Sequence, residues 1–134
     1  MSEENVEIVR RGVEAWNRRD SAAWLLTYAA PDAEWSPGLG GAVEGTVYRG
    51  TDEIAKGLDW VWQGMDEFHF VESEVRDLGE SVLWLGRAKM RGTASHVELD
   101  QEYGLLHVWR DGKVVTVQGF LGWCEALKAV GLEE

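Results

Sequence analysis

Apolar residues recur at helical spacing in three segments of the first half of the chain. A first helix is predicted over about 2–19, where one face carries Val6, Val9, Val13 and Trp16. Asp20 is a suitable N-cap for a second, short helix that ends by Pro31. Thr51 is a suitable N-cap for a third helix, whose apolar stripe consists of Ile54, Leu58, Val61 and Met65. A short strand at 33–36 is predicted before this third helix.

After the third helix the period of the pattern changes to two, which is typical of strands. Four strands are predicted, over 68–75, 81–91, 96–110 and 113–121. Asp111-Gly112, between the last two, is a strong signal for a tight hairpin. A final helix is predicted over 123–130, with Gly131 just past its C-terminus. Helices followed by long antiparallel strands predict an α+β fold, with helices on one face of a curved sheet.

Composition narrows the classes of partner. With 134 residues the chain has the size of one ordinary domain, so 1–134 is expected to form a single domain. Its 24 acidic and 13 basic residues give a net charge of -11, which disfavours nucleic acid and anionic membranes as partners. No apolar run is long enough to cross a bilayer, and the single Cys124 fits a reducing compartment. A cytoplasmic location is therefore expected.

Two features indicate a pocket. The chain holds eight tryptophans, and rings at that density either fill a core or line a cavity for an apolar ligand. The segment from Pro37 to Gly50 contains five glycines and no sustained periodicity. It is predicted to be a mobile loop over one end of the domain, of the kind that often serves as a lid.

Motifs along the chain carry a resemblance to a known superfamily. They are E-A-W-N-R-R-D at 14–20, D-A-E-W-S-P at 32–37, Y-R-G-T-D-E-I at 48–54, L-G-R-A-K-M-R-G at 85–92, and W-R-D-G-K-V-V at 109–115 followed by F-L-G-W-C-E-A-L-K-A-V-G-L at 120–132. In this order they resemble the nuclear-transport-factor-2-like superfamily, and within it the SnoaL-like domains. The resemblance implies a cone-shaped antiparallel or mixed sheet wrapped around the N-terminal helices, a ligand cavity between them, and a homodimer. This fold hosts isomerases, cyclases, dehydratases, epoxide hydrolases and proteins without known chemistry, so it does not determine a reaction.

The resemblance allows two catalytic arrangements to be checked by position. Ketosteroid-isomerase-like members use a tyrosine, an aspartic acid and an aspartate, and the corresponding residues here are Gly12, Leu105 and Ser36. None of these three side chains can perform that chemistry. Limonene-epoxide-hydrolase-like members use an aspartate, arginine, aspartate triad. Here Gly119 stands at one aspartate position, although Arg87 falls near the arginine, so an epoxide hydrolase is a weak alternative.

SnoaL-type polyketide cyclases use a strand carboxylate, or a carboxylate and a histidine, to remove a proton. His107 with Glu102 or Asp100 would approximate this arrangement, which stays open. His107 also shares its strand parity with Tyr103, so an imidazole and a phenol would face the same side. Together they suffice for proton transfer next to a carbonyl, with the imidazole as base and the phenol as oxyanion donor. The alternative is a histidine whose only role is in the core.

Arg87 is expected to face the same cavity and to stabilise negative charge there, because a buried guanidinium needs a carboxylate or an anionic ligand. The alternative is a purely structural ion pair near the rim with Glu34, Asp100 or Glu102. The walls of the cavity are expected to be aromatic and aliphatic. The predicted ligand-binding residues are Trp35, Leu58, Val61, Leu85, Leu105 and Trp109.

The predicted function is therefore binding of an apolar small molecule that bears a carbonyl or a carboxylate. If the protein is an enzyme, the expected reaction is of isomerase, polyketide-cyclase or dehydratase type, with His107, Arg87 and Tyr103 as catalytic residues. No histidine or cysteine motif has the spacing of metal ligands, so neither a metal nor a cofactor is expected. A non-catalytic ligand-binding or dimeric interaction module is the main alternative.

Overall fold

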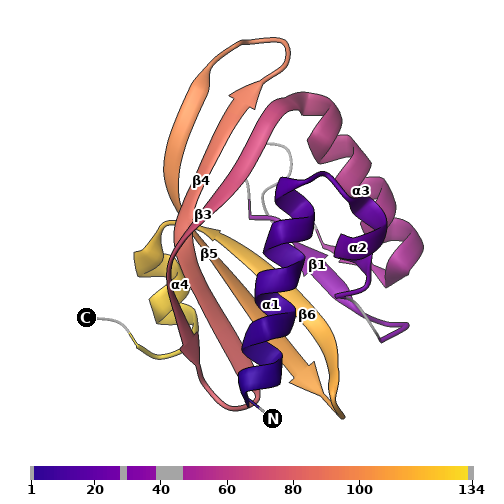
Figure 1. The fold of residues 1–134 in the computed structure, drawn as a ribbon, viewed down its shortest axis with the longest axis vertical. Helices are drawn as coiled ribbons and strands as arrows, with labels where there is room; N and C mark the ends of the chain where they lie inside the picture. The colour runs from indigo at the N-terminus through magenta and orange to yellow at the C-terminus, as the bar shows by residue number, and fades with distance from the viewer. Residues whose placement is uncertain (1, 28–29, 39–46, 133–134) are drawn as a thin grey trace.

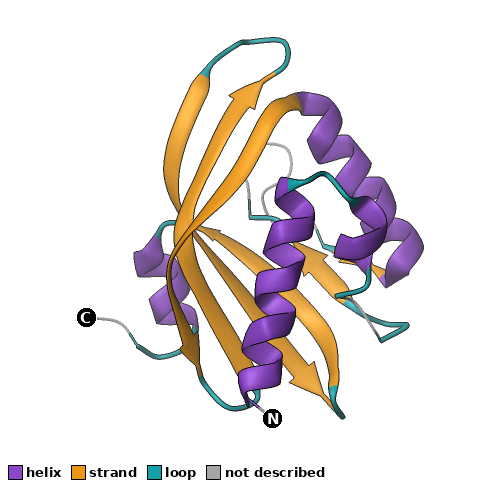
Figure 2. Ribbon diagram, viewed as in Figure 1, coloured by secondary structure: helices purple, strands orange, loops and turns teal. Residues whose placement is uncertain are grey.

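The fold is a curved six-stranded sheet that holds three helices on its concave side and a fourth on its other side (Figures 1 and 2). The computed structural model describes residues 2–27, 30–38 and 47–132. Along the chain the elements are α1 (Ser2–Asn17), α2 (Ser21–Leu25), β1 (Glu34–Ser36), β2 (Tyr48–Arg49), α3 (Gly50–Gly64), β3 (Met65–Asp77), β4 (Ser81–Gly92), β5 (Glu98–Arg110), β6 (Lys113–Leu121) and α4 (Trp123–Ala129).

The strand order in the sheet is β2-β1-β6-β5-β4-β3. Within the described ranges, β1 and β6 pair in parallel and the other neighbouring strands are antiparallel. The sheet is therefore mixed, and it stays open because β2 and β3 lie at opposite edges. This architecture confirms the predicted α+β fold.

Local signals explain the ends of the helices. The Asp20 side chain accepts a hydrogen bond of 3.1 Å from the backbone N–H of Ala23, which confirms it as the N-cap of α2. The third helix begins at Gly50 with Arg49 at its N-cap position, so the expected Thr51 cap is wrong. At the end of α4, Gly131 has a φ of 74°, and the N–H of Leu132 bonds back to the carbonyl of Leu127 at 2.8 Å. This is the helix ending that the glycine predicts.

The four long strands occur where the period of two predicts them. Asp111 and Gly112 have φ values of 54° and 76°, as expected for a two-residue hairpin turn in which both residues are left-handed. The two-residue strand β2 was not predicted, because it pairs with a segment far away in the chain. The predicted lid falls mainly on residues 39–46, which lie outside the described residues.

The first helix crosses the concave side of the sheet and is held there by polar contacts to β3 (Figure 1). The side-chain amide of Asn17 donates to the carbonyl of Phe70 at 3.0 Å and accepts from its N–H at 2.8 Å. Arg10 forms a two-bond contact with Glu72 at 2.9 and 3.1 Å. These contacts fix α1 so that its apolar face covers the sheet.

The two faces of the central strand β4 belong to different apolar clusters. Val82, Trp84, Ala88 and Met90 point into the main core, beneath the helices. Leu83 and Leu85 point the other way and form a second cluster with Ala126 of α4. Because α4 covers this outer face, β4 is apolar on both sides. The alternation of its residues therefore cannot show which face of the strand meets the helices on the concave side.

Candidate functional site

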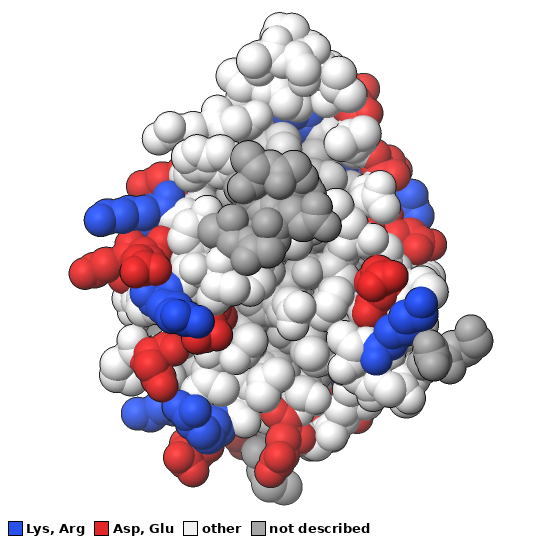
Figure 3. Space-filling model, turned by 180° about the vertical axis from the view of Figure 1, so that it is seen from behind, with Lys and Arg blue, Asp and Glu red and all other residues white. Residues whose placement is uncertain are grey.

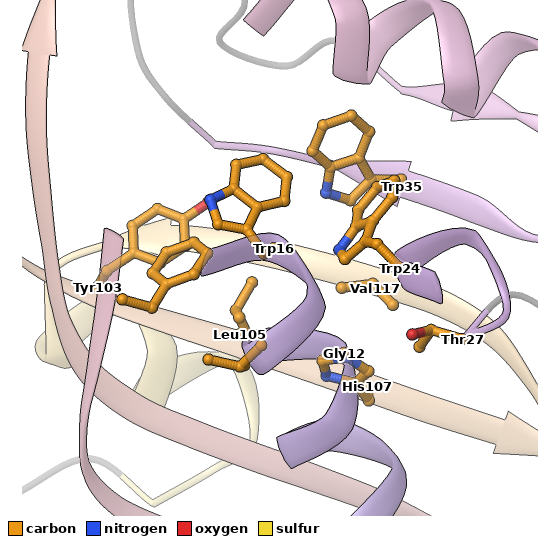
Figure 4. Close-up of a pocket in the computed structure, with 11 residues that line it drawn as sticks. Gly12, Trp16, Trp24, Thr27, Trp35, Tyr103, Leu105, His107 and Val117 are labelled. Carbon is orange, nitrogen blue, oxygen red and sulfur yellow. The ribbon is translucent and has the colours of Figure 1, made fainter. Parts of the chain in front are cut away.

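A small hollow lies between α1, α2 and the concave side of the sheet (Figure 4). Its volume is about 20 Å³, which is room for about one water molecule. Its lining is mostly aromatic and aliphatic, and none of the residues carries a formal charge at neutral pH. They are Gly12, Val13, Trp16, Trp24, Thr27, Trp35, Phe70, Tyr103, Leu105, His107 and Val117.

Three tryptophans form one wall of the hollow (Figure 4). The ring of Trp16 meets those of Trp24 and Trp35 edge to face, with centroids 5.4 and 6.0 Å apart. Trp24 and Trp35 are themselves 4.9 Å apart in the same arrangement. Such contacts are favourable for aromatic rings. The high tryptophan content therefore fills most of the interior and leaves only a small space.

The only imidazole in the hollow is that of His107, which is 4 % exposed. Burial lowers the pKa of this imidazole from 6.5 to about 3, because the charged form loses its hydration. The side chain is therefore neutral at pH 7. Its Nδ1 is buried and has no hydrogen-bond partner within the described part of the chain. Most buried polar atoms do have a partner, so this nitrogen is available to a ligand.

Trp16 presents a second nitrogen of this kind. The residue is 3 % exposed, and its Nε1–H finds no acceptor among the residues that the structure describes. An indole N–H can only donate, whereas a neutral imidazole both donates and accepts. Figure 4 draws the Trp16 nitrogen beside the Tyr103 hydroxyl and His107 beside Gly12, so the two residues offer hydrogen bonds at different ends of the hollow.

Tyr103 lines the hollow, but its hydroxyl is already engaged. The phenol is 2 % exposed, and it donates a hydrogen bond to the backbone carbonyl of Pro37. Burial raises the pKa of this phenol, so it stays protonated. A phenol has a single proton to donate. The predicted use of Tyr103 as an oxyanion donor would therefore require it to release Pro37.

Arg87 lies outside the hollow, contrary to the expectation from the sequence. Its side chain is 43 % exposed, and its Nε donates to Oδ1 of Asp100 at 2.6 Å. Its Nη2 also donates to the backbone carbonyl of Asp100 at 3.0 Å. Leu85 shares this outward parity and packs under α4. The predictions for Arg87 and Leu85 are wrong for the same reason. The even-numbered residues of β4, such as Trp84, face the concave side, and the odd-numbered ones face away from it.

The pairing of His107 with Glu102 or Asp100, which the sequence leaves open, is not supported by the structure. Asp100 is bound to Arg87. Glu102 accepts a hydrogen bond of 3.3 Å from the backbone N–H of Trp123, at the start of α4. Neither carboxylate lines the hollow, because residues 100 and 102 have the opposite parity to 107 on β5.

Comparison with known proteins places this fold in a family. A sequence profile of the SnoaL-like domain matches residues 9–117, which is well over half of the chain. The chain belongs to the SnoaL-like domain family. No curated protein gives a significant match. Among solved structures, this SnoaL-like domain is similar to several with TM-scores above 0.7.

One of these is an NTF2-like protein of unknown function from Burkholderia pseudomallei, with a TM-score of 0.76, 24% identity, and coverage of 92% of this chain and 95% of that one. A putative SnoaL-like polyketide cyclase from Jannaschia sp. has a TM-score of 0.77, 17% identity, and coverage of 99% and 95%. A protein with a ketosteroid isomerase-like fold from Catenulispora acidiphila, in complex with trimethylamine, has a TM-score of 0.75, 16% identity, and coverage of 94% and 93%. At these identities the three structures show the fold alone.

The remaining predicted wall residues divide between the hollow and the core of the SnoaL-like domain. Trp35 and Leu105 line the hollow. Leu58, Val61 and Trp109 are buried in the surrounding core without lining it. Among the described residues, no group of three or more His, Cys, Asp or Glu is placed to hold a metal ion. No described helix has the length and apolarity to cross a membrane.

Sequence reasoning missed several residues of the hollow. Trp16 and Trp24 were not among the predicted wall residues, and the structure places both in the core and in the lining of the hollow. Gly12 gave a usable signal, because a glycine within an amphipathic helix lowers helix stability and often marks a close approach. A Cβ at this position would lie 2.8 Å from Oγ1 of Thr27. Phe70 and Val117 carried no signal that separates them from other strand residues.

Proposed function

We propose that residues 1–134 act as one domain that binds an uncharged small molecule, whose carbonyl or hydroxyl oxygen enters the hollow. The observation that carries this proposal is the pair of buried, unpartnered nitrogens, Trp16 Nε1 and His107 Nδ1, in the described lining of one space. A carbonyl oxygen accepts hydrogen bonds from such donors, and a hydroxyl can also donate to the imidazole. Satisfying them removes the penalty of leaving polar atoms unpaired.

The charge of the lining selects the neutral form of the ligand. With Arg87 outside, no cation faces the hollow among the described residues, so a carboxylate there would be a buried, uncompensated charge. Of the two predicted ligand groups, the carbonyl is therefore favoured over the carboxylate. The volume of about 20 Å³ suits the oxygen-bearing end of a ligand rather than a whole ring system.

The relatives support a small-molecule role. The neighbouring structures include a putative polyketide cyclase and a protein in complex with trimethylamine. The first name refers to a reaction on an organic molecule, and the second structure holds a small amine. They add support to binding in this domain, and they leave the reaction open because identity is below 25%.

Proton transfer next to the ligand carbonyl is the second candidate, with His107 as base. It is favoured by one observation, the neutral imidazole in direct contact with the hollow. However, a pKa near 3 makes the imidazole a weak base, since proton transfer is most efficient when the pKa is close to the working pH. Binding is therefore the better supported function. Epoxide hydrolysis is not proposed, because Gly119 and the outward Arg87 leave no triad.

The proposal includes a homodimer through the side of the sheet that faces away from α1. On this side charged residues gather along the margins, and the middle is mostly uncharged (Figure 3). Two copies that each carry -11 repel one another, so they are expected to meet through an uncharged surface. Light scattering should give twice the chain mass of 15.0 kDa, and a single-chain mass at every concentration would contradict the dimer.

Calorimetric titration with 2-heptanone, a slender neutral ketone, tests the binding proposal. Replacing His107→Leu keeps an apolar side chain and removes one hydrogen bond, which should weaken 2-heptanone binding about fivefold. Heptane, which has the same seven-carbon chain without the carbonyl, should bind the variant at least as well as the wild type. Arg87→Gln is the matched control and should change neither affinity, since Arg87 lies outside the hollow. No measurable binding of 2-heptanone, or an equal loss for both probes, would overturn the proposal.

A further inference from the structure

The Tyr103 end of the hollow has two polar groups of opposite kind. Trp16 and Tyr103 both pack on the ring of Phe70, with centroid distances of 5.4 and 5.3 Å, and all three residues line the hollow. The Trp16 nitrogen and the Tyr103 hydroxyl are drawn next to each other in Figure 4. They do not bond to each other, because Trp16 Nε1 has no hydrogen-bond partner among the described residues. A small polar group of a ligand can therefore bridge them.

The Tyr103 hydroxyl presents only its lone pairs to such a group. Its single proton goes to the carbonyl of Pro37. Pro37 is fully buried, so turning the proton toward the hollow would take this donor away from a buried carbonyl, which is costly. A phenol oxygen that donates can still accept. Among the described residues none donates to it, so its lone pairs are available.

This end of the hollow thus offers one donor, the indole N–H, and one acceptor, the phenol oxygen. An alcohol hydroxyl matches both, because it can accept from Trp16 and donate to Tyr103. A ketone oxygen matches the indole alone, and its lone pairs would face those of the phenol. At the other end of the hollow, His107 Nδ1 offers one hydrogen bond to either kind of ligand. The Tyr103 end therefore distinguishes an alcohol from a ketone.

We propose that the ligand is a neutral alcohol, whose hydroxyl accepts from Trp16 Nε1 and donates to Tyr103 Oη. This inference rests on the proposed function and narrows its ligand class from a carbonyl or hydroxyl compound to an alcohol. Tyr103 is the residue that determines this specificity, because its oxygen accepts the hydroxyl proton. A ketone binds more weakly, with its oxygen at His107.

Calorimetric titration with 2-heptanol and 2-heptanone tests the inference, since the two molecules share a carbon skeleton and differ only in hydroxyl or carbonyl. One additional hydrogen bond should make 2-heptanol bind about fivefold more tightly. If 2-heptanone binds and 2-heptanol binds no more tightly, the inference is wrong and the proposed function stands. If neither probe binds, the proposed function itself fails, and the inference fails with it.

A variant of the accepting oxygen tests the role of Tyr103. Tyr103→Phe keeps the ring and removes the oxygen, so it should abolish the preference for 2-heptanol without weakening 2-heptanone. Tyr48→Phe is the matched control, because Tyr48 lies outside the described lining of the hollow, and this variant should keep the preference. A fivefold preference that survives in Tyr103→Phe would overturn the inference.

Nitrogen NMR of the wild type provides a second test, which is needed if Tyr103→Phe fails to fold without its bond to Pro37. In a ¹⁵N-labelled sample, saturation with 2-heptanol should move the Trp16 Nε1–H signal further than saturation with 2-heptanone. The reason is that the alcohol bonds to this N–H, whereas the ketone oxygen lies at His107. An equal or smaller shift with the alcohol would contradict the inference.

Discussion

The residue on which the account depends most is His107. It is almost completely buried, and its ring lies 6.2 Å from that of Trp109 on the same strand. A solvent-facing histidine would titrate near pH 6.5. Here the absence of hydration keeps the imidazole neutral, which makes it suited to bind an uncharged group and poorly suited to hold a charge.

This burial predicts a pH dependence of folding. The pKa of His107 is about 3 in the folded state, and an unfolded histidine has a pKa of about 6.5. As the pH falls below 6.5, His107 binds a proton in the unfolded chain but stays neutral in the folded protein. The stability that the neutral imidazole provides is thus complete above pH 6.5 and is lost progressively toward pH 3.

Urea unfolding at pH 7 and pH 5 measures this loss. The wild type should lose about 2 kcal/mol more than His107→Gln between the two pH values, since the variant has no group to titrate. His69 is exposed, so His69→Gln should behave like the wild type. Equal losses in the wild type and in His107→Gln would mean that His107 is hydrated in the folded protein.

The sequence predicted single residues well where their strand alternates between polar and apolar positions. On β5, Tyr103, Leu105 and His107 all line the hollow, and the acidic residues of the first part of the strand point outward. On β4 the same reasoning was wrong for Leu85 and Arg87. The difference is physical, because alternation can be interpreted only when one face of a strand meets solvent.

At the scale of elements, the helices and long strands were predictable because their periods are local. The contacts between elements were not. α4 buries Ala126 against Leu83 and Leu85, and so turns the outer face of β4 into a second core. Likewise, Tyr103 of β5 holds the carbonyl of Pro37, just after β1, across β6.

The hydrogen bond between Tyr103 and Pro37 depends on Gly119 of β6, which has no side chain. A Cβ at Gly119 would overlap both the Tyr103 hydroxyl and the Pro37 carbonyl. Gly119→Ala should therefore lower the free energy of unfolding by about 1–3 kcal/mol through overpacking. Gly64, the last residue of α3, has no atom within 4 Å of such a Cβ, so Gly64→Ala should be neutral or stabilising by up to about 1 kcal/mol. Urea denaturation compares the two, and equal effects would refute this packing argument.

At the scale of the whole molecule, the hollow exists only because distant segments meet. Gly12, Trp35, Tyr103 and Val117 come from α1, β1, β5 and β6, which the strand order brings together on the concave side. The small size of the space also depends on how the tryptophans pack against one another. Local sequence patterns contain neither the contacts between these segments nor the packing of the rings. The sequence therefore predicted that a pocket exists, but not its volume or all of its lining residues.

Charged side chains are separated from the interior of the protein. Every described residue that lines the hollow is uncharged at neutral pH, whereas Arg11 and Arg18 are exposed outside it and pair with Glu7 and Asp20.

The central claim is that a ligand with a carbonyl or hydroxyl oxygen enters the hollow that Trp16 and His107 line. Nitrogen NMR of a ¹⁵N-labelled sample tests it most directly. On saturation with 2-heptanone, the signals of Trp16 Nε1 and of the His107 imidazole should shift, because the ketone oxygen gives one of these nitrogens a hydrogen bond and the ligand packs against the other ring. The signal of Trp60, which is 55% exposed, should stay in place. Unchanged Trp16 and His107 signals in a sample that binds the ketone would contradict the account.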